Sequence, residues 1–235
     1  MEFKGFEKLS LIEYPGKIVS VVFAGGCNFR CPFCQNPDLV LNSAKLPSIP
    51  EEEVINYLIS KRKWLDGLAI TGGEPIIHKD LPDFLAKVKK EGLSIELETN
   101  GSEPLMIKKL IDNNLIDYVA MDIKAPLTWE KYKEAAGINS KELFERVKES
   151  LKLLLKSKIE YEFRTTLVPG LLTEKDVIKI TEQIKGTKRY VLQQFIPDKT
   201  LQEDYKQIKP YSLEEIEKIK ERVKKSLGVC EIRGI

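Results

Sequence analysis

Short runs of β-branched and apolar residues alternate along the chain with longer stretches in which apolar residues recur every three or four positions. The short runs predict β-strands, and the amphipathic stretches predict helices. The predicted strands cover residues 18–23, 67–71, 94–99, 118–123, 160–167, 190–195 and 229–232. The predicted helices cover residues 50–63, 81–90, 105–113, 141–156, 174–184 and 213–226.

Six strand–helix alternations predict an α/β fold in which a parallel sheet is flanked by helices. Right-handed crossovers place the C-terminal ends of all these strands on one side, so the chemistry should gather in the loops that follow them. The periodicity alone is compatible with an open doubly wound sheet and with a partial barrel. No internal repeat or linker interrupts the pattern, so we expect residues 1–235 to form a single domain.

The first of these loops holds three of the four cysteines, Cys27, Cys31 and Cys34, in the segment GGCNFRCPFCQ. Three thiolates can hold a four-iron cluster and leave one iron open to an external ligand. They can also form a structural zinc site completed by Cys230 or by His78, the only histidine. Four cysteines are too few for a disulfide framework in a chain of this length. The spacing alone leaves iron–sulfur and zinc open.

The charge composition narrows the class of partner. Lys and Arg number 38 and Asp and Glu number 36, which gives a net charge of +2. This balance argues against nucleic acid or a membrane surface as the partner, because both attract a strongly basic face. No apolar run is long enough to span a bilayer, and the N-terminus lacks signal-peptide character. We therefore expect a cytoplasmic protein.

The later predicted strands also end in, or lead into, polar residues of types that bind ligands. These residues are Gly72, Gly73, Glu74, Glu98, Thr99, Asn100, Asp122, Lys124, Arg164, Gln193 and Gln194. Together with the cysteine loop, six separate segments bring polar groups to one edge of the predicted sheet, which indicates a binding site.

Each of these groups also has a structural interpretation. A Gly-Gly pair usually marks a tight turn, although Gly72 and Gly73 would also expose backbone carbonyls that accept from an ammonium group together with Glu74. Asp122 and Lys124 alternate on a strand and can pair with each other. Arg164 lies in an apolar strand, where a guanidinium needs an anionic partner, and a ligand carboxylate is one candidate.

The sequence also leaves open the roles of Asn100, Gln193 and Gln194. Asn100 followed by Gly101 is most often a turn. Gln193 and Gln194 are either polar core residues or ligand contacts, and the sequence does not separate the two.

The cysteine spacing C-x3-C-x2-C, with Phe33 before the last cysteine, resembles the signature of the radical S-adenosylmethionine (SAM) enzymes. Gly72-Gly73-Glu74 resembles the motif with which this superfamily binds the methionine amino group. The opening GFEKLSLIEYPGK and the run CNFRCPFCQNPDLV are similar to the activating enzymes of glycyl radical enzymes, such as that of anaerobic ribonucleoside-triphosphate reductase. Other stretches resemble the activator of pyruvate formate-lyase. The resemblance covers almost the whole chain.

This resemblance implies a partial (β/α)6 barrel, a [4Fe-4S] cluster and SAM bound at its open iron. It implies reductive cleavage of SAM and removal of a hydrogen atom from a backbone glycine of a partner glycyl radical enzyme. A flavodoxin- or ferredoxin-type protein would supply the electron. Gln193-Gln194 departs from the family pattern, which has a histidine-containing segment there.

The resemblance also implies roles for residues. Cys27, Cys31 and Cys34 would bind the cluster, and Gly72, Gly73 and Glu74 would bind the ammonium group of SAM. The other expected SAM-binding residues are Thr99, Asn100, Asp122, Lys124 and Arg164, of which Lys124 and Arg164 would meet the carboxylate. Oxygen atoms of Glu98, Thr99 and Asp122 could hold a monovalent cation. Glu13, Gln193 and Gln194 are candidates for contact with the substrate.

Two other functions fit parts of the pattern. A radical SAM enzyme could act on a small molecule in the biosynthesis of a modified nucleoside or a cofactor. A zinc-stabilised binding module without catalysis would use the cysteines structurally.

Overall fold

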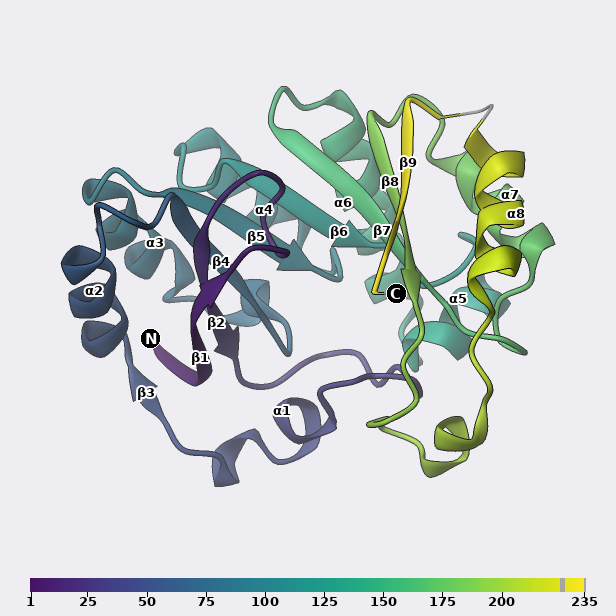
Figure 1. Ribbon diagram of the computed structural model, residues 1–235, viewed down its shortest axis with the longest axis horizontal. Coiled ribbons are helices and arrows are strands. Elements are labelled where there is room, and N and C mark those ends of the chain that lie inside the picture. Colours follow the sequence, from purple (N-terminus) through teal and green to yellow (C-terminus); the bar gives the residue numbers. More distant parts are fainter. Residues whose placement is uncertain (225–226, 235) are drawn as a thin grey trace. The chain divides into compact units, whose positions relative to one another are not determined.

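The computed structural model describes residues 1–224 and 227–234 and divides the chain into two compact units (Figure 1). Unit 1 contains residues 1–28, 38–99 and 103–120, and unit 2 contains residues 29–37, 100–102 and 121–235. The single domain expected for residues 1–235 stays a prediction. No helix among the described residues has the length and apolar character that a bilayer span requires.

Unit 1 is built on strands in the order β3-β1-β2-β4-β5. Its strands are β1 (Glu2–Ser10), β2 (Val19–Ala24), β3 (Ile49–Pro50), β4 (Gly67–Gly72), β5 (Ser94–Thr99) and the first part of β6 (Tyr118–Asp122). Its helices are α1 (Pro37–Leu41), η1 (Ser43–Lys45), α2 (Glu51–Ser60), η2 (Pro75–Ile77), α3 (Leu81–Lys90) and α4 (Pro104–Asp112). Strands β2, β4 and β5 are parallel, as predicted.

Strand β1 was missed by the sequence pattern, and it corrects the prediction of a purely parallel sheet. It pairs antiparallel with β2 and with the short β3. Its burial is irregular, with buried Phe3 and Ser10 separated by exposed and half-buried residues. A strand whose burial does not alternate gives no clear period-2 signal, so periodicity could not detect it.

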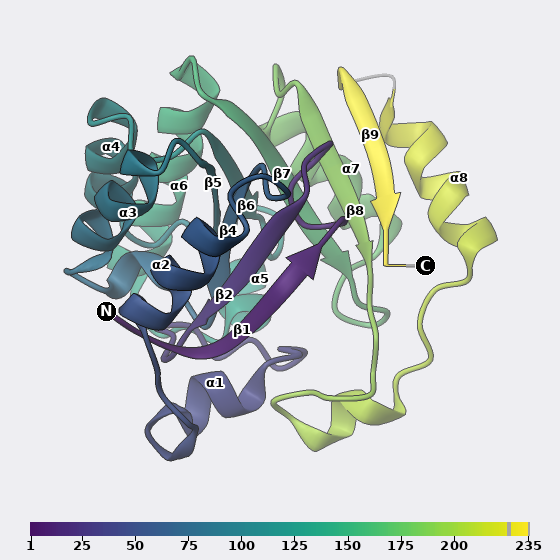
Figure 2. The same ribbon diagram turned by 60° about the vertical axis from the view of Figure 1, so that its left-hand side comes forward.

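The core of unit 1 follows from strand alternation. Val19, Val21 and Phe23 point to one side of β2 and pack with Tyr14, Ala69, Tyr118 and Ala120. Helix α3 lies against β5 and beside α2, and its buried face includes Leu81, Phe84 and Val88 (Figure 2). The apolar positions that predicted these elements are therefore the ones that build the core.

Unit 2 repeats the strand–helix alternation. Its elements are α5 (Trp129–Ala136), α6 (Lys141–Lys156), β7 (Glu160–Leu167), α7 (Glu174–Gln183), β8 (Arg189–Gln194), η3 (Glu203–Gln207), α8 (Leu213–Val223) and β9 (Val229–Arg233). Strands β7, β8 and β9 are parallel, and α8 packs on α7 and β9 (Figure 2). Helix α5 was missed. The last helix was predicted to reach residue 226, but residues 225 and 226 lie outside the described part.

Helix ends in unit 2 are fixed by capping. Thr173 and Asp176 form a capping box at the start of α7, and Ser212 and Glu215 form another at the start of α8.

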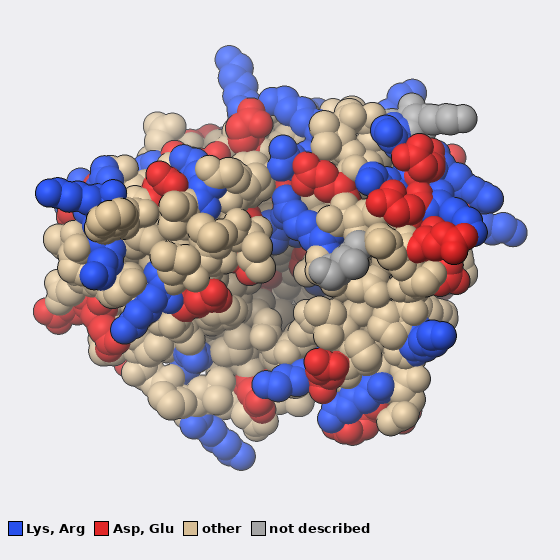
Figure 3. Space-filling model, viewed as in Figure 1, with Lys and Arg blue, Asp and Glu red and all other residues tan. Residues whose placement is uncertain are grey.

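Positive and negative side chains are intermixed on the surface. Figure 3 shows Lys and Arg interspersed with Asp and Glu on the face in view. This agrees with the near balance of charges in the composition.

Candidate functional site

In unit 1, the glycine pair at the end of β4 lies directly against the segment that leads to Cys27. The Gly73 N–H donates to the Ala24 carbonyl and the Glu74 N–H to the Gly26 carbonyl, both at 2.8 Å. A Cβ atom on Gly72 would lie 2.5 Å from Ala24 N and O, and one on Gly73 would collide with the Gly26 carbonyl. Only glycine at these two positions allows the two backbone segments to touch, so both glycines have a structural role. Their predicted contact with an ammonium group stays a prediction.

The segment before Cys27 is held from two further directions. The Gly26 N–H donates to the Leu39 carbonyl at 2.8 Å, and His78 Nε2 lies 2.8 Å from the Gly25 carbonyl oxygen. His78, which the sequence offered as a zinc ligand, thus has a backbone partner in unit 1. The backbone around Cys27 is fixed by hydrogen bonds to three other segments.

Glu74 is almost fully buried, with 1% of its surface exposed. The Thr99 hydroxyl donates to its Oε1 at 2.7 Å, and the Ile76 N–H contacts the same oxygen at 3.4 Å. Hydrogen bonds to the charged form compensate for part of the cost of burying a carboxylate. Glu74 and Thr99 therefore form one buried polar group at the ends of β4 and β5.

We expect Thr99→Val to lower the free energy of unfolding by about 1.5–3 kcal/mol, because it removes a hydrogen bond to a buried charged group. Urea unfolding measures this change. The matched control is Thr181→Val: Thr181 is equally buried, but its hydroxyl donates to the Ile178 carbonyl of its own helix. Equal losses in the two variants would contradict a special contribution of the Thr99–Glu74 bond.

The cation ligands predicted on β5 lie next to each other. Glu98 and Thr99 are consecutive in this strand, so their side chains point to opposite faces. A single cation could meet both residues only if one of them used its backbone carbonyl. The cation site stays a prediction.

In unit 2, the second and third cysteines lie in a loop that is anchored to the end of α5. The Arg30 N–H donates to the Ala136 carbonyl at 3.0 Å, and the buried Cys31 Sγ lies 3.7 Å from the same oxygen. Gly137 ends α5 with a φ of +60°, and any Cβ there would collide with the Arg30 carbonyl. The Cys34 N–H donates to the Cys31 carbonyl at 3.1 Å, which gives the two thiols a tight turn between them.

Lys124 and Asp122 form an ion pair of 2.7 Å, the pairing that the sequence offered as the structural interpretation. The Lys124 ammonium also lies 5.8 Å from the centre of the Phe33 ring. Burial lowers the pKa of Lys124, but the charges of Asp122 and of the Cys31 thiolate raise it by more. The net shift is upward, so a positive charge is maintained beside the cysteine loop.

Two other predicted residues have local structural partners. Asn100 Oδ1 accepts from the Ser102 N–H at 2.9 Å, which confirms the turn predicted there. The Gln194 amide donates to the Tyr211 carbonyl at 2.9 Å. Gln193 lies on the opposite face of β8, the face that also carries Arg189. The predicted ligand contacts of both glutamines stay predictions.

Arg164 is buried in β7, as predicted, but its guanidinium has a partner within the protein. Its Nε donates to Glu162, a fully buried carboxylate two residues earlier on the same strand. Arg233 of β9 donates to both oxygens of Glu162. The sequence analysis missed Glu162 and Arg233. The available signal was the spacing of opposite charges two residues apart, at 162 and 164 and again at 231 and 233, in runs predicted as strands.

None of the four cysteines, all of which lie in the described part of the chain, takes part in a disulfide. Cys27 belongs to unit 1, and Cys31 and Cys34 belong to unit 2. Neither unit by itself, within residues 1–224 and 227–234, has three His, Cys, Asp or Glu side chains arranged to hold a metal ion. The assignment of the three cysteines to one cluster therefore stays a prediction from their spacing.

Two further predicted residues are Cys230 and Glu13. Cys230, the other candidate zinc ligand, is buried on β9, and burial raises the pKa of its thiol to about 11. It remains a neutral small side chain at physiological pH. Glu13 is half-buried in the loop between β1 and β2. Its predicted contact with the substrate stays a prediction.

Comparison with known proteins gives the family. The sequence profile of the Radical SAM superfamily matches residues 21–184. Over 234 residues the chain is 33% identical to a Methanocaldococcus jannaschii protein that is provisionally named a glycyl-radical enzyme activating enzyme, with 98% of this chain and 95% of that protein covered. It is 28% identical over 229 residues to the pyruvate formate-lyase-activating enzyme of Clostridium pasteurianum, with 94% and 92% covered.

Among solved structures, the crystal structure of Streptococcus suis SuiB superposes with a TM-score of 0.71 at 15% identity. The superposition covers 91% of this chain and 48% of SuiB, so the chain spans about half of that protein. This similarity concerns the fold. It confirms the predicted α/β class, an open sheet of the radical SAM partial-barrel type.

The chain belongs to the radical SAM superfamily and, within it, to the glycyl-radical enzyme activating enzymes. It is therefore an enzyme, and the family implies a [4Fe-4S] cluster and SAM. The residues present fit these groups. Three cysteines outside any disulfide are of the residue type that would hold such a cluster, and the buried carboxyl of Glu74 is of the type that would meet an ammonium group.

Proposed function

We propose that this enzyme removes a hydrogen atom from a backbone glycine of a partner glycyl radical enzyme. The observation that carries the proposal is the similarity to an activating enzyme over nearly the full length of both chains. When bound, the reduced cluster and SAM supply the radical chemistry. The protein supplies binding, orientation and charge.

The proposed residue roles follow the motifs, and the local geometry supports several of them. Cys27, Cys31 and Cys34 bind the cluster, and the close packing of Gly73 on Gly26 fixes the backbone just before Cys27. The N–H groups of Gly73 and Glu74 donate to this segment. The SAM ammonium is assigned to oxygen atoms of the same motif, namely backbone carbonyls of the glycines and the Glu74 carboxylate. These are the atoms that an ammonium donor requires.

The carboxylate of SAM is assigned to cationic side chains of unit 2. Lys124 remains charged because Asp122 pairs with it, and Arg164 is oriented by Glu162. Thr99 and Asn100 are assigned to the carboxylate or the ribose, and Asp122 acts through Lys124. A monovalent cation at Glu98, Thr99 and Asp122 is part of the same proposal. Glu13, Gln193 and, less directly, Gln194 are assigned to the incoming peptide.

Electron paramagnetic resonance tests the reaction. We expect a glycine-centred radical signal when the anaerobically reconstituted enzyme, SAM and a low-potential reductant such as a reduced flavodoxin are mixed with the partner protein. The matched control is the partner with its radical glycine replaced by alanine, which should give no such signal.

A protein that cleaves SAM but produces no radical on any co-encoded glycyl radical enzyme would contradict the proposed substrate. It would then favour a small-molecule radical SAM reaction. Colourless protein with zinc in place of iron would contradict the radical chemistry itself.

A further inference from the structure

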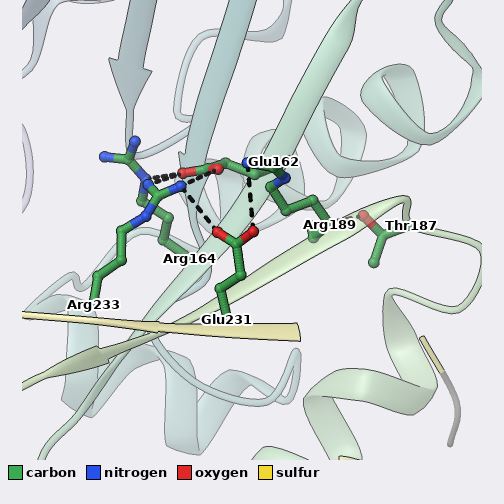
Figure 4. Close-up of polar contacts among 6 residues, drawn as sticks. All are labelled: Glu162, Arg164, Thr187, Arg189, Glu231 and Arg233. Carbon is green, nitrogen blue, oxygen red and sulfur yellow. Dashed lines mark hydrogen bonds and ion pairs between the residues drawn. The ribbon is translucent and has the colours of Figure 1, made fainter. Parts of the chain in front are cut away.

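Five charged side chains form a continuous series of ion pairs on three neighbouring strands of unit 2 (Figure 4). Glu162 and Arg164 lie on β7, Arg189 lies on β8, and Glu231 and Arg233 lie on β9. The three strands are parallel and in register, and residues two apart on a strand point to the same face. The five side chains therefore share one face of the sheet.

Glu162 is the centre of this series. Arg233 Nη1 donates to Glu162 Oε1 at 2.6 Å, and Arg233 Nη2 donates to Oε2 at 2.9 Å. Arg164 Nε donates to the same Oε1. Two arginines from different strands thus bind one carboxylate that is fully buried. A carboxylate at such a depth is stable only when it is paired and hydrogen-bonded, and a two-point arginine fork provides both.

Burial changes along the series. The side chain of Arg164 is 9% exposed and that of Glu162 is fully buried, whereas Arg233, Arg189 and Glu231 are 25%, 32% and 38% exposed. Arg189 pairs with the outer carboxylate, Glu231, at 3.7 Å. Arg233 therefore extends from the accessible side of the series to the buried carboxylate, and Arg189 does not.

The hydrogen bond that Arg164 donates to Glu162 restricts the orientation of the Arg164 guanidinium. A guanidinium is planar and carries five N–H donors in fixed directions. With Nε directed to Glu162, the plane of the Arg164 group is set, and its terminal nitrogens point away from that carboxylate (Figure 4). Glu162 is in turn held by both Nη atoms of Arg233. The orientation of Arg164 thus depends on a residue of the last strand.

We propose that Glu162 and Arg233 are positioning residues that set the direction in which Arg164 meets the carboxylate of SAM. This inference rests on the proposed function, which assigns that carboxylate to Arg164. It makes β9 a functional part of the SAM site, with Arg233 acting through Glu162 and not by contact with the cofactor.

The test is a double-mutant cycle on the reconstituted holoenzyme, with the Kd for SAM measured by calorimetry. We expect Arg164→Ala to raise this Kd by about 10–100-fold, the usual effect of losing a charged hydrogen bond. We expect Arg233→Met to raise it by about 5–10-fold, because Arg164 loses its fixed direction. In the Arg164→Ala background, Arg233→Met should have almost no further effect.

Two variants serve as controls. Arg189→Met removes an arginine from the same face but leaves the contacts of Glu162 intact, so the Kd should stay within about twofold of the native value. Arg233→Lys keeps the charge but replaces a two-point fork with a single donor, so it should restore part of the affinity. Circular dichroism and thermal unfolding of each variant establish that it is folded.

The outcomes separate the inference from the proposal beneath it. An unchanged Kd in Arg164→Ala would overturn the assignment of Arg164 and the inference together. A raised Kd for SAM in Arg164→Ala, together with an unchanged Kd in Arg233→Met, would overturn the inference but not the assignment of Arg164. Additive losses in the double variant would also overturn it, because Arg233 would then act independently of Arg164. If Arg233→Met does not fold, Arg233→Lys is carried through the same cycle.

Discussion

Cys31→Ala should abolish cluster assembly and with it the reductive cleavage of SAM. After anaerobic reconstitution the native chain should hold about four iron atoms, and the variant should hold almost none. With two thiolates left, two irons of the cubane would have no protein ligand, so the cluster would not be retained. Iron and sulfide analysis measures the cluster, and release of methionine measures the cleavage. The buried position of Cys31 against the end of α5 makes it the most enclosed of the three thiols.

Cys230→Ala is the matched control for this experiment. Cys230 is also a buried cysteine of unit 2, but it lies on β9 and the pKa of its thiol is raised to about 11, so it is a poor metal ligand. This variant should keep its iron and its activity, with a loss of stability on the order of 1 kcal/mol. Full SAM cleavage by Cys31→Ala, or loss of iron in Cys230→Ala, would disprove the ligand assignment.

Gly73→Ala should have the second-largest effect, and it should affect both stability and iron content. The added methyl group would collide with the Gly26 carbonyl, which is backbone and cannot rotate away. The hydrogen bonds from Gly73 to Ala24 and from Glu74 to Gly26 would be strained or lost. Overpacking and two weakened hydrogen bonds together cost roughly 3–5 kcal/mol. Because Gly26 precedes Cys27, displacement of this segment should also lower iron loading.

Gly170→Ala separates the collision from the general cost of replacing a glycine. Gly170 has a φ of +83° with open space around the position of a Cβ, so its substitution adds strain of about 1–2 kcal/mol without a collision. Thermal unfolding and iron analysis of both variants make the comparison. A Gly73→Ala protein that matched Gly170→Ala in both measurements would show that the close approach of Gly73 to Gly26 has no special importance.

The secondary structure was predictable wherever one face of an element is clearly apolar. Helix α3, helix α6 and strands β5 and β7 begin and end at the residues that periodicity indicates. Strand β1 and helix α5 escaped prediction for a common reason. Strand β1 has irregular burial along the sheet edge, and α5 is short, with its burial concentrated at Tyr132, Ala135 and Ala136. Short or irregularly buried elements depend on tertiary contacts that a local pattern does not contain.

The candidate site was predictable only as a set of residue types. The sequence indicated Glu74, Lys124 and Arg164, but not the partners that determine their charge and direction. Thr99 bonds to Glu74, Asp122 pairs with Lys124, and Glu162 holds Arg164. The second of these pairs is local and was anticipated. The role of Arg233 could not be anticipated, because it depends on the register of β8 and β9.

The sequence by itself determined the superfamily. The cysteine spacing and the glycine–glutamate motif are local features that can be recognised without the fold. The tertiary structure decided which backbone touches Gly73, which carboxylate fixes Arg164, and that the last strand supplies Arg233. These facts join residues up to 71 positions apart. Such contacts arise from strand pairing and the burial of charge, which the whole fold satisfies at once and no short segment can specify.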